Sequence, residues 1–372
     1  MLFCFVRCQK KVNYLLKYAI DSNASDIHIT QGKKSWVRVN GALGEFGEVV
    51  PLSDIDEFVE LVIPDILNEY RKIREKKRIE PIDGAFKYMF RRFRINIYLG
   101  MDGINVALRL LSDKISTLDE LYLPSSLERF TEIKSGLFLV VGTTGSGKST
   151  TLASMIDRIN HSRSENILTI EQPVEYIHLS DKSRIEQIEV GLHIDSFNMA
   201  TISAMRQNPN IILIGEMRDL DTIQNAITLA ETGHVVYGTL HAKSVTDTID
   251  RIIDVFPPKQ QEQIRIQLAG VLKGIMHQTL VRNKTGVVPL IELLSVDDVT
   301  AAMIIGKQKP NTIRDHMRSK SSYGNVHIVD NAVWHIQNSR LEFETLKNTL
   351  SPDDYSMVRA IISTTKKGGF YG

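Results

Sequence analysis

The residues best suited to chemistry form one glycine-rich run, residues 142–149, with the sequence GTTGSGKS. This run matches a phosphate-binding loop, in which glycines let successive backbone N–H groups turn toward phosphate oxygens. Lys148 would bring a positive charge to the β and γ phosphates, and Ser149 would offer a hydroxyl to Mg²⁺. The run follows a predicted buried strand, 137–141, and precedes a predicted helix whose positive end would face the phosphates. The alternative is a glycine-rich turn without a ligand.

Eight residues of this loop and of the helix start are predicted to bind nucleotide. They are Thr143, Thr144, Gly145, Ser146, Gly147, Lys148, Ser149 and Thr150.

Carboxylates and histidines flank three other predicted strands. Glu216 follows the apolar run 211–214, Glu171 and Glu175 follow the run 167–170, and the run 235–239 has His234 before it and His241 after it. Ligands of α/β sheets bind at the carboxyl ends of the strands, so these groups belong beside the phosphate loop. Simpler roles stay open: Glu216 as a helix-capping acid, each histidine as a core residue, and Glu171 as a brace for the following turn.

The elements that must position these groups fall into two parts. From residue 137 onward, short continuous apolar runs alternate with helical segments, which is typical of a parallel sheet buried on both faces. Beyond Phe256 the pattern predicts helices. Before residue 112 an amphipathic helix starts near Val12, and short strands are predicted at 26–30, 36–40, 93–99 and 104–111, with helices in 52–70. We therefore predict an α/β protein with a mixed N-terminal domain, 1–122, and a phosphate-loop domain, 123–372.

Composition restricts the protein class. The 372 residues include 42% hydrophobic and 24% charged residues, enough for two domain cores. The only two cysteines, Cys4 and Cys8, cannot form a disulfide framework or a four-thiolate zinc site, which predicts a cytoplasmic protein. The apolar run 1–6 is too short for a signal peptide and precedes its positive charges, and no run reaches membrane-spanning length. We expect at most peripheral membrane contact.

Charge is balanced overall but uneven locally. The chain has 45 Lys or Arg and 44 Asp or Glu, so its formal net charge is +1 and no nucleic-acid partner is required. Residues 71–94 nevertheless contain ten Lys or Arg and three acids. This excess leaves a nucleic-acid motor open as an alternative, although a solvated basic surface accounts for residues 71–78 equally well.

Four motifs occur in an order that resembles the secretion ATPases of the type II secretion and type IV pilus class. They are the phosphate loop 142–151, an acidic motif at 167–178, a second acidic motif at 208–219, and a histidine motif at 230–241. The sequence ASDIH at 24–28 also looks like the family's N-terminal entry motif, and the resemblance extends over about residues 24–280. It implies a PAS-like N-terminal domain followed by a RecA-like ATPase domain.

The resemblance also implies a role for each site residue. Glu175 would orient the attacking water, and Glu216 would hold Mg²⁺ through water. His241 would sense the γ-phosphate, and His234 would support the same loop. A free carboxylate has a pKa of about 4, so Glu175 would position the water more than deprotonate it.

Two arginines of the N-terminal domain complete the implied site. Arg94 and Arg109 match arginines that the family presents to nucleotide at a domain or subunit boundary, where the guanidinium fork can bind phosphate oxygens in a bidentate manner. The implied protein is a hexameric ATPase that uses ATP and Mg²⁺ and works on a platform protein of the inner membrane. Ordinary solvent-facing arginines on a strand are the alternative.

Three departures from the family pattern limit what the resemblance implies, and the last of them makes the direction of work less certain. Gln172 replaces an Asp of the first acidic motif, and Asp102 occupies a position where the retraction branch has an Arg. The retraction motif would fall on 299–306, where Ala301 and Ile305 replace both of its arginines. The chain has no room for the longer N-terminal region and tetracysteine insertion of assembly and secretion members. We therefore predict pilus retraction, with an assembly or secretion motor, or a scaffold that binds ATP without hydrolysis, as alternatives.

Overall fold

The computed structural model describes residues 10–39, 41–77, 80–111, 114–283, 286–319 and 324–367. Cys4 and Cys8 lie outside these ranges. The chain divides into two compact units, one up to Lys114 and one from Ile115 onward, with the short segment Glu175–Ile177 grouped with the first. The sequence predicted the division after residue 122. The difference arises because Leu118 and Leu121 pack into the core of the second unit.

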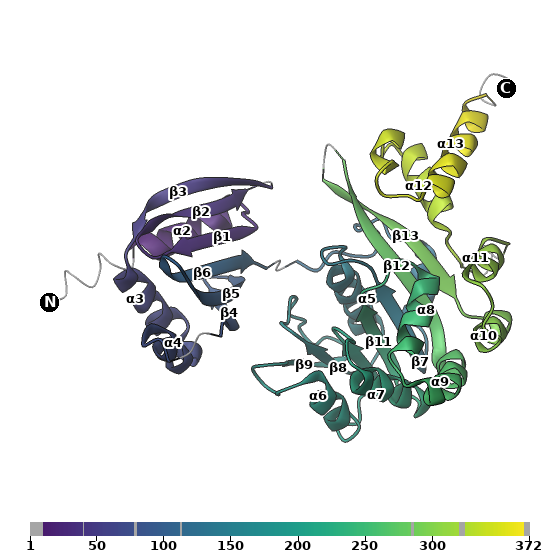
Figure 1. Ribbon diagram of the computed structural model, residues 1–372, viewed down its shortest axis with the longest axis horizontal. Helices are drawn as coiled ribbons and strands as arrows, with labels where there is room; N and C mark the ends of the chain where they lie inside the picture. The colour runs from purple at the N-terminus through teal and green to yellow at the C-terminus, as the bar shows by residue number, and fades with distance from the viewer. Residues whose placement is uncertain are drawn as a thin grey trace. The chain divides into compact units, whose positions relative to one another are not determined.

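The N-terminal unit is one antiparallel sheet with helices (Figure 1). Its sheet order is β3-β2-β1-β6-β5-β4, and every neighbouring pair is antiparallel. The elements are α2 (Lys10–Asp21), β1 (Asp26–Thr30), β2 (Lys33–Val39), β3 (Ala42–Val50), α3 (Leu52–Val62), α4 (Leu67–Arg74), β4 (Ile82–Tyr88), β5 (Arg91–Gly100) and β6 (Gly103–Leu110).

Hydrophobic periodicity explains how this unit packs. Along β5 the side chains of Phe93, Ile95 and Ile97 are fully buried, while the residues between them are at least partly exposed. This alternation is what a strand with one buried face requires. Arg94 therefore lies on the face of the sheet opposite the core.

The C-terminal unit is built on a seven-stranded sheet. Its order is β13-β12-β7-β11-β10-β8-β9, and every neighbouring pair is parallel except β12 with β13. The strands are β7 (Gly136–Val141), β8 (Asn166–Glu171), β9 (Arg184–Glu189), β10 (Ile211–Ile214), β11 (Val235–Leu240), β12 (Leu272–Arg282) and β13 (Val287–Ser295). The helices are α5 (Lys148–Ser162), α6 (Phe197–Ala204), α7 (Leu220–Glu231), α8 (Val245–Asp254), α9 (Pro258–Val271), α10 (Asp298–Ile305), α11 (Pro310–Ser319), α12 (Ile328–Gln337) and α13 (Pro352–Lys367).

Both faces of this sheet are buried, as the continuous apolar runs predicted. Along β7, Leu137 and Leu139 join a core with α6 to α9, whereas Phe138 and Val140 join a second core with α5. The four predicted runs are β7, β8, β10 and β11. The predicted α/β architecture, with a small N-terminal sheet domain and a C-terminal parallel-sheet domain, is confirmed.

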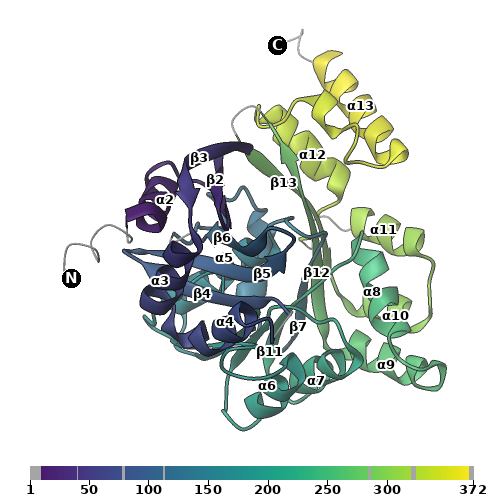
Figure 2. The ribbon, with the colours of Figure 1, turned by 60° about the vertical axis from the view of Figure 1, so that its left-hand side comes forward.

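The prediction of helices alone beyond Phe256 was wrong. After α9 the chain forms two long strands, β12 and β13, which extend the sheet beside β7 before the chain turns helical again (Figure 2). In β13, Val288 and Leu290 pack on α12 through Val329 and Ala332. Long-range pairing with β7 stabilises β12 as a strand, and local sequence does not report such pairing.

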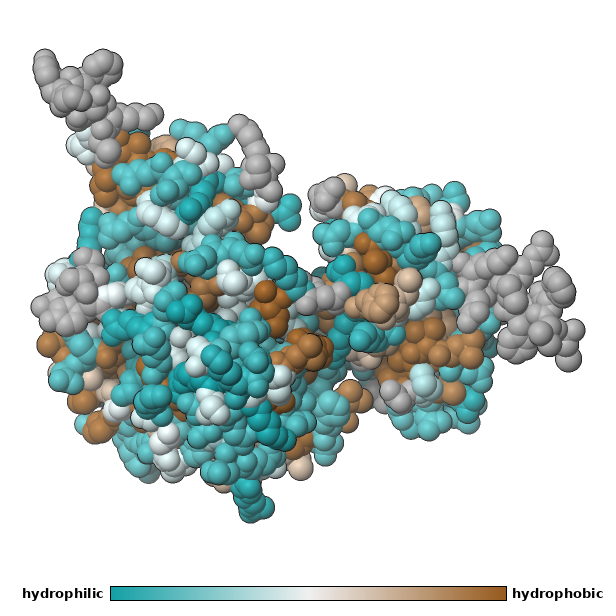
Figure 3. Space-filling model, turned by 180° about the vertical axis from the view of Figure 1, so that it is seen from behind, coloured by the Kyte–Doolittle hydropathy of each residue, from teal (hydrophilic) through white to brown (hydrophobic). Residues whose placement is uncertain are grey.

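The face in Figure 3 is largely hydrophilic, and its apolar atoms form small separate patches. Among the residues that the structure describes, no helix is both long and apolar enough to cross a bilayer.

Candidate nucleotide site

The glycine-rich loop lies where the sequence predicted it, between β7, which ends at Val141, and α5, which begins at Lys148. Gly142, Gly145 and Gly147 have φ values of 150°, 77° and 87°, a region that favours glycine. Gly147 is the N-cap of α5, so the free N–H groups of the first helical turn face the loop. The loop therefore has the backbone of an anion-binding site.

The Lys148 side chain folds back onto the loop. Its Nζ donates hydrogen bonds to the carbonyl oxygens of Gly142 at 2.9 Å and Thr143 at 3.0 Å. The ammonium group thus lies against the loop that would surround the phosphates. A cation in this position would bind a phosphate oxygen without a large change of backbone.

The loop leaves room for a ligand on its outer side. Thr143, Thr144 and Gly145 are exposed, and a Cβ placed on Gly145 would meet no atom within 4 Å. The Ser146 hydroxyl is buried and has no hydrogen-bond partner among the described residues. Ser149 and Thr150, in the first turn of α5, are partly exposed. The exposed outer side of the loop leaves space for a phosphate group, and the Ser146 hydroxyl is available to bond it.

A buried glutamine from β12 holds the inner side of the loop. Gln278 donates from Nε2 to the carbonyl oxygen of Ser146 at 2.8 Å and accepts at Oε1 from the Thr151 hydroxyl at 2.7 Å. Its neighbour His277 is also buried, and desolvation lowers the pKa of that imidazole to about 4, with Lys148 and Arg314 acting in the same direction. Sequence reasoning missed Gln278 because its strand was predicted as helix.

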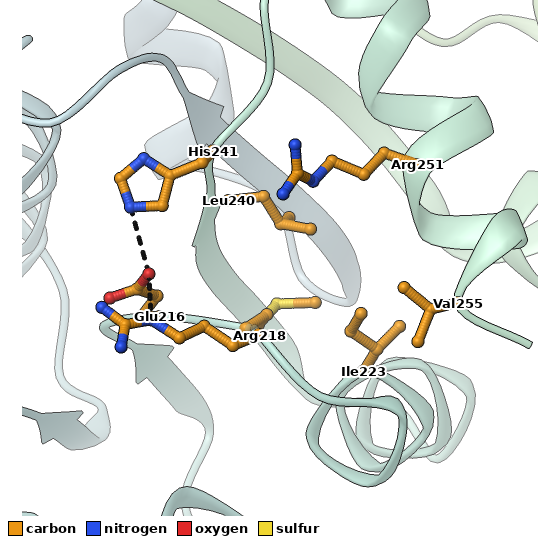
Figure 4. A pocket seen from close by; sticks show the side chains of 8 residues that line it. Glu216, Arg218, Ile223, Leu240, His241, Arg251 and Val255 are labelled. Atoms are coloured by element: carbon orange, nitrogen blue, oxygen red, sulfur yellow. Dashed lines mark ion pairs between the residues drawn. The ribbon is translucent and has the colours of Figure 1, made fainter.

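Two further predicted residues meet at the same sheet edge. His241 follows β11 and Glu216 follows β10, and the His241 Nε2 lies 3.1 Å from the Glu216 Oε1 (Figure 4). Arg218 forms a close ion pair with the same oxygen. The Glu216 carboxylate therefore faces two basic side chains at this edge of the sheet, and the contact with Glu216 raises the pKa of Arg218. We call Glu216, Arg218 and His241 the carboxylate cluster.

A cavity of about 380 Å³ opens beside this cluster. Figure 4 shows the His241 ring and the Arg218 guanidinium against the Glu216 carboxylate, with Arg251 reaching in from α8. The lining residues are Glu216, Met217, Arg218, Ile223, Leu240, His241, Arg251 and Val255. Polar groups at one end and apolar side chains at the other are typical of a binding cavity.

Backbone contacts connect the three strand ends. The Gly142 N–H donates to the Leu240 carbonyl at 3.4 Å, and the Met217 N–H donates to the Thr239 carbonyl at 2.9 Å. Because β7, β11 and β10 are adjacent and parallel, the phosphate loop, His241 and Glu216 lie along one edge of the sheet. This is the arrangement that the sequence predicted from strand ends.

The segment after β8 holds Glu171 and Glu175 differently. Glu171 Oε1 accepts from the Thr169 hydroxyl at 2.7 Å and from Gln187 Nε2 at 3.3 Å, so these bonds join it to β8 and β9. Glu175 makes no hydrogen bond or ion pair within the part of the chain that the structure describes. The preceding N–H, of Val174, donates at 3.0 Å to buried Glu189, which the sequence did not single out.

His234 does not join this group. It lies at the amino end of β11, where its Nδ1 contacts the Leu229 carbonyl at 2.9 Å and the Thr232 hydroxyl at 3.1 Å. The six residues of β11 separate it from His241. This placement does not support the predicted role of His234 beside the His241 loop, because His234 lies after α7 at the opposite edge of the sheet.

Arg94 and Arg109 face each other in the N-terminal unit, on paired positions of β5 and β6. Arg109 Nε lies 3.0 Å from Asp26 Oδ1, and an Arg94 Nη lies 3.6 Å from Asp83 Oδ1. Burial would raise the pKa of Asp26, but hydrogen bonds from Ser25 and Arg109 outweigh it and lower that pKa. The Arg94 side chain is 40% exposed and the Arg109 side chain 63%, so each can exchange its carboxylate for another anion.

The departures from the family pattern lie at exposed positions except for Ala301, which is partly buried. Asp102, in the turn between β5 and β6, is 2.6 Å from the Lys33 ammonium. Gln172 is exposed in the segment after β8. Ala301 and Ile305 lie on α10, where Ala301 packs on the core and Ile305 is exposed.

The described side chains do not form a metal site by themselves. Among the described residues, no group of three or more His, Cys, Asp or Glu is arranged to hold a metal ion. A cation at the phosphate loop would therefore take most of its ligands from phosphate and water, as Mg²⁺ prefers. Ser149 and Glu216 carry the oxygen groups whose chemistry fits it.

Comparison with known proteins gives consistent matches. The family model "Type II/IV secretion system protein" matches residues 6–346. The "Type IV pilus retractation ATPase PilT" of Pseudomonas aeruginosa is 39% identical over 276 residues, which are 74% of this chain and 79% of that protein. A "Twitching motility protein" of Neisseria gonorrhoeae is 41% identical over 60% of each chain.

A solved structure matches over nearly the whole length. It is the crystal structure of "the Pilus Retraction Motor PilT and Bound ADP", with a TM-score of 0.81 and 35% sequence identity. The match covers 92% of this chain and 98% of that one. Both units of the fold, including β12 and β13, therefore have a counterpart of known structure.

Proposed function

Because the chain belongs to the Type II/IV secretion system protein family, we propose that it is an ATP-hydrolysing motor that powers retraction of a type IV pilus. It would act as a hexamer at the cytoplasmic face of the inner membrane, against a platform protein. The observation that carries the ATPase proposal is the meeting of the phosphate loop, His241 and Glu216 at one sheet edge. Relatives named for pilus retraction and twitching motility support the direction of work.

In this proposal the loop N–H groups and Lys148 bind the phosphates of ATP. Lys148 exchanges its bonds to Gly142 and Thr143 for phosphate oxygens. Ser149 and Glu216 would hold Mg²⁺, Glu216 through water. When bound, Mg²⁺ neutralises charge on the phosphate oxygens.

Two residues act on the reacting end of the nucleotide. Glu175 accepts a hydrogen bond from the attacking water and orients it, which its lack of other partners among the described residues allows. His241, already 3.1 Å from Glu216, would contact the γ-phosphate and exchange that contact when the phosphate leaves. Such an exchange gives ATP and ADP different binding energies in two conformations, which mechanical coupling requires.

Arg94 and Arg109 supply positive charge from the N-terminal domain of the same or a neighbouring copy. Mixing inactive Arg94→Ala protein with inactive Glu216→Ala protein tests this. Recovery of ATPase activity in mixed rings supports a site shared between copies. Assembled mixed rings without any recovery contradict it.

Deletion of the gene tests the direction of work. The proposal expects more surface pili and no retraction-driven motility, both restored by the wild-type gene and not by Lys148→Ala. Cells without pili would instead identify an assembly motor. That alternative has one observation in its favour, the absence of arginine at Ala301 and Ile305.

A nucleic-acid motor fits less well. Within residues 71–94, Lys72 pairs with Glu69, Arg74 with Asp56, and Lys77 with Glu75. These ion pairs neutralise part of the positive charge that the sequence shows there. The motor proposal expects no salt-sensitive binding of DNA or RNA in a filter assay, whereas tight salt-sensitive binding would favour the alternative.

A further inference from the structure

We infer that Gln278 is a positioning residue for the nucleotide site: it orients the peptide between Ser146 and Gly147 so that the phosphate loop is shaped before ligand arrives. The inference rests on the proposed function, since it concerns the same loop. The Gln278 side chain joins two points on either side of the loop's last glycine, Ser146 and Thr151.

Strand pairing brings Gln278 to this place. In the parallel ladder of β12 and β7, Met276 is opposite Val140 and His277 is opposite Val141. Gln278 is therefore level with Gly142, the first residue of the loop. The rest of β12 and its partner β13 make this strand part of the rigid sheet.

The hydrogen bond to Ser146 has a direct consequence for ligand binding. In a planar trans peptide the C=O and the following N–H point in opposite directions. Gln278 draws the Ser146 carbonyl toward β12, so the Gly147 N–H must point the other way, away from β12. Helix-start N–H groups with this orientation are the donors that a phosphate-binding loop uses.

Burial makes the contact hard to replace. Gln278 is 3% exposed, Ser146 3% and Thr151 1%. Water has little access to these groups, and a buried carbonyl without a hydrogen-bond partner is strongly disfavoured. Without Gln278, rotation of the Ser146–Gly147 peptide toward the open side of the loop becomes the cheapest way to satisfy the Ser146 carbonyl, and the Gly147 N–H is then lost to the ligand.

Gln278 also lies close to two glycines of the loop. A Cβ on Gly147 would come within 2.7 Å of Gln278 Nε2, and a Cβ on Gly142 would overlap the Gln278 carbonyl oxygen. The Gln278 backbone thus excludes a side chain at residue 142, and a side chain at residue 147 would displace the Gln278 amide; both positions also have positive φ angles. The loop and residue 278 fit each other as a unit.

The test uses the full chain and a fluorescent N-methylanthraniloyl derivative of ADP with Mg²⁺. Gln278→Leu removes both hydrogen bonds and should weaken ADP binding by about tenfold or more. Gln278→Glu removes the donor to Ser146 and adds negative charge near the phosphates, so its loss should be larger. In ATP hydrolysis the Gln278→Leu change should appear mainly as a higher KM.

Thr151→Val provides a second variant that keeps Gln278 in place. It should weaken ADP binding by about threefold to tenfold, and the double variant should be no weaker than Gln278→Leu alone, because both act through one amide. If Gln278→Leu does not fold, Thr151→Val alone carries the test. Gln267→Leu is the matched control, since Gln267 bonds Glu231 at 3.2 Å, outside the loop.

The outcomes separate the two claims. Folded Gln278→Leu and Thr151→Val proteins that bind ADP within twofold of wild type, with lower melting temperatures only, would overturn the positioning role. Additive losses in the double variant would also contradict it. Wild-type protein that binds no ADP would overturn the proposed nucleotide site itself, and the inference with it.

Discussion

The phosphate loop and the carboxylate cluster lie on one sheet edge but are held by different forces. On its inner side the loop is held by two buried hydrogen bonds between uncharged groups, which join Ser146 and Thr151 to Gln278, 3% exposed. The cluster is held by ion pairs whose side chains are 21% exposed for Glu216, 37% for His241 and 73% for Arg218. Exposed ion pairs contribute about 0–1 kcal/mol, whereas breaking a buried hydrogen bond costs about 1–3 kcal/mol.

This difference suits the loop for nucleotide binding and the cluster for rearrangement during turnover. A loop that is rigid before binding loses little entropy when phosphate arrives, which favours affinity. The ion pairs of the carboxylate cluster are weak enough for an incoming phosphate or metal charge to rearrange them. We therefore expect changes in the loop to weaken nucleotide binding, and changes in the cluster to affect turnover more than binding.

Removal of the loop cation should have the largest effect. Lys148→Ala deletes the charge that the loop holds between Gly142 and Thr143, and ATPase activity should fall on the order of 10²- to 10³-fold with weakened nucleotide binding. Steady-state phosphate release and ADP titration measure both. Lys259→Ala, in the first turn of α9, is the control. Near-normal binding by Lys148→Ala would remove the distinction between the two regions.

Neutralising the cluster should reduce turnover by a smaller factor. Glu216→Gln keeps the shape but loses the charge that would hold Mg²⁺ through water, so kcat should fall roughly 10- to 100-fold while ADP affinity changes by threefold or less. Raising the Mg²⁺ concentration should recover part of the activity. Glu186→Gln, an exposed change on β9, controls for charge loss. Equal losses in kcat and affinity would contradict the separation.

His277, on the strand behind the loop, should make the free energy of unfolding depend on pH. The pKa of His277 is lowered to about 4 by burial, below its unfolded value of about 6.5, so the folded state favours the neutral ring. Above pH 6.5 the buried neutral ring does not reduce the free energy of unfolding. As pH falls below 6.5 the free energy of unfolding decreases, because the unfolded chain takes up a proton that the folded chain does not. Between pH 7.5 and 5 this costs about 2 kcal/mol.

Urea unfolding followed by Trp334 fluorescence in a Trp36→Phe background measures this effect in the C-terminal unit. His277→Leu should lose about 2 kcal/mol less than its parent between pH 7.5 and 5. His161→Leu should not reduce the loss, since that exposed ring has a raised pKa. An unchanged pH slope in His277→Leu would show that the ring is not a buried neutral group.

Arg218 should show the smallest effect. Its guanidinium is 73% exposed and its ion pair with Glu216 competes with water, so Arg218→Ala should change the free energy of unfolding by less than about 1 kcal/mol. ATPase activity should change by about threefold or less. A hundredfold loss of activity in this variant would indicate that Arg218 contacts the nucleotide.

Much of the site was predictable because its signals are local. The apolar runs that became β7, β10 and β11 are contiguous in sequence, and the residues after a parallel strand must lie at its carboxyl edge. The strand pattern alone therefore places Glu216 and His241 together. His234 shows the limit of that logic, because a residue before the strand lies at the opposite edge.

The contacts that shape the loop were not predictable from sequence. Gln278 reaches Ser146 only because β12 pairs with β7, across more than a hundred residues, in a register that local patterns do not encode. Glu189 is similar, since its bond to Val174 depends on β9 lying beside β8. In the N-terminal unit β3 and β4 were missed because glycines and polar residues interrupt their alternation.

The central claim, that this site hydrolyses ATP with Glu175 orienting the water, is tested most directly by multiple-turnover phosphate release. Wild-type protein with Mg-ATP should release many phosphates per chain. Glu175→Gln should bind ATP with near-normal affinity but release almost none. Equal phosphate release by the two proteins would contradict the assigned role of Glu175, and the absence of release by wild-type protein that binds ATP would contradict the motor.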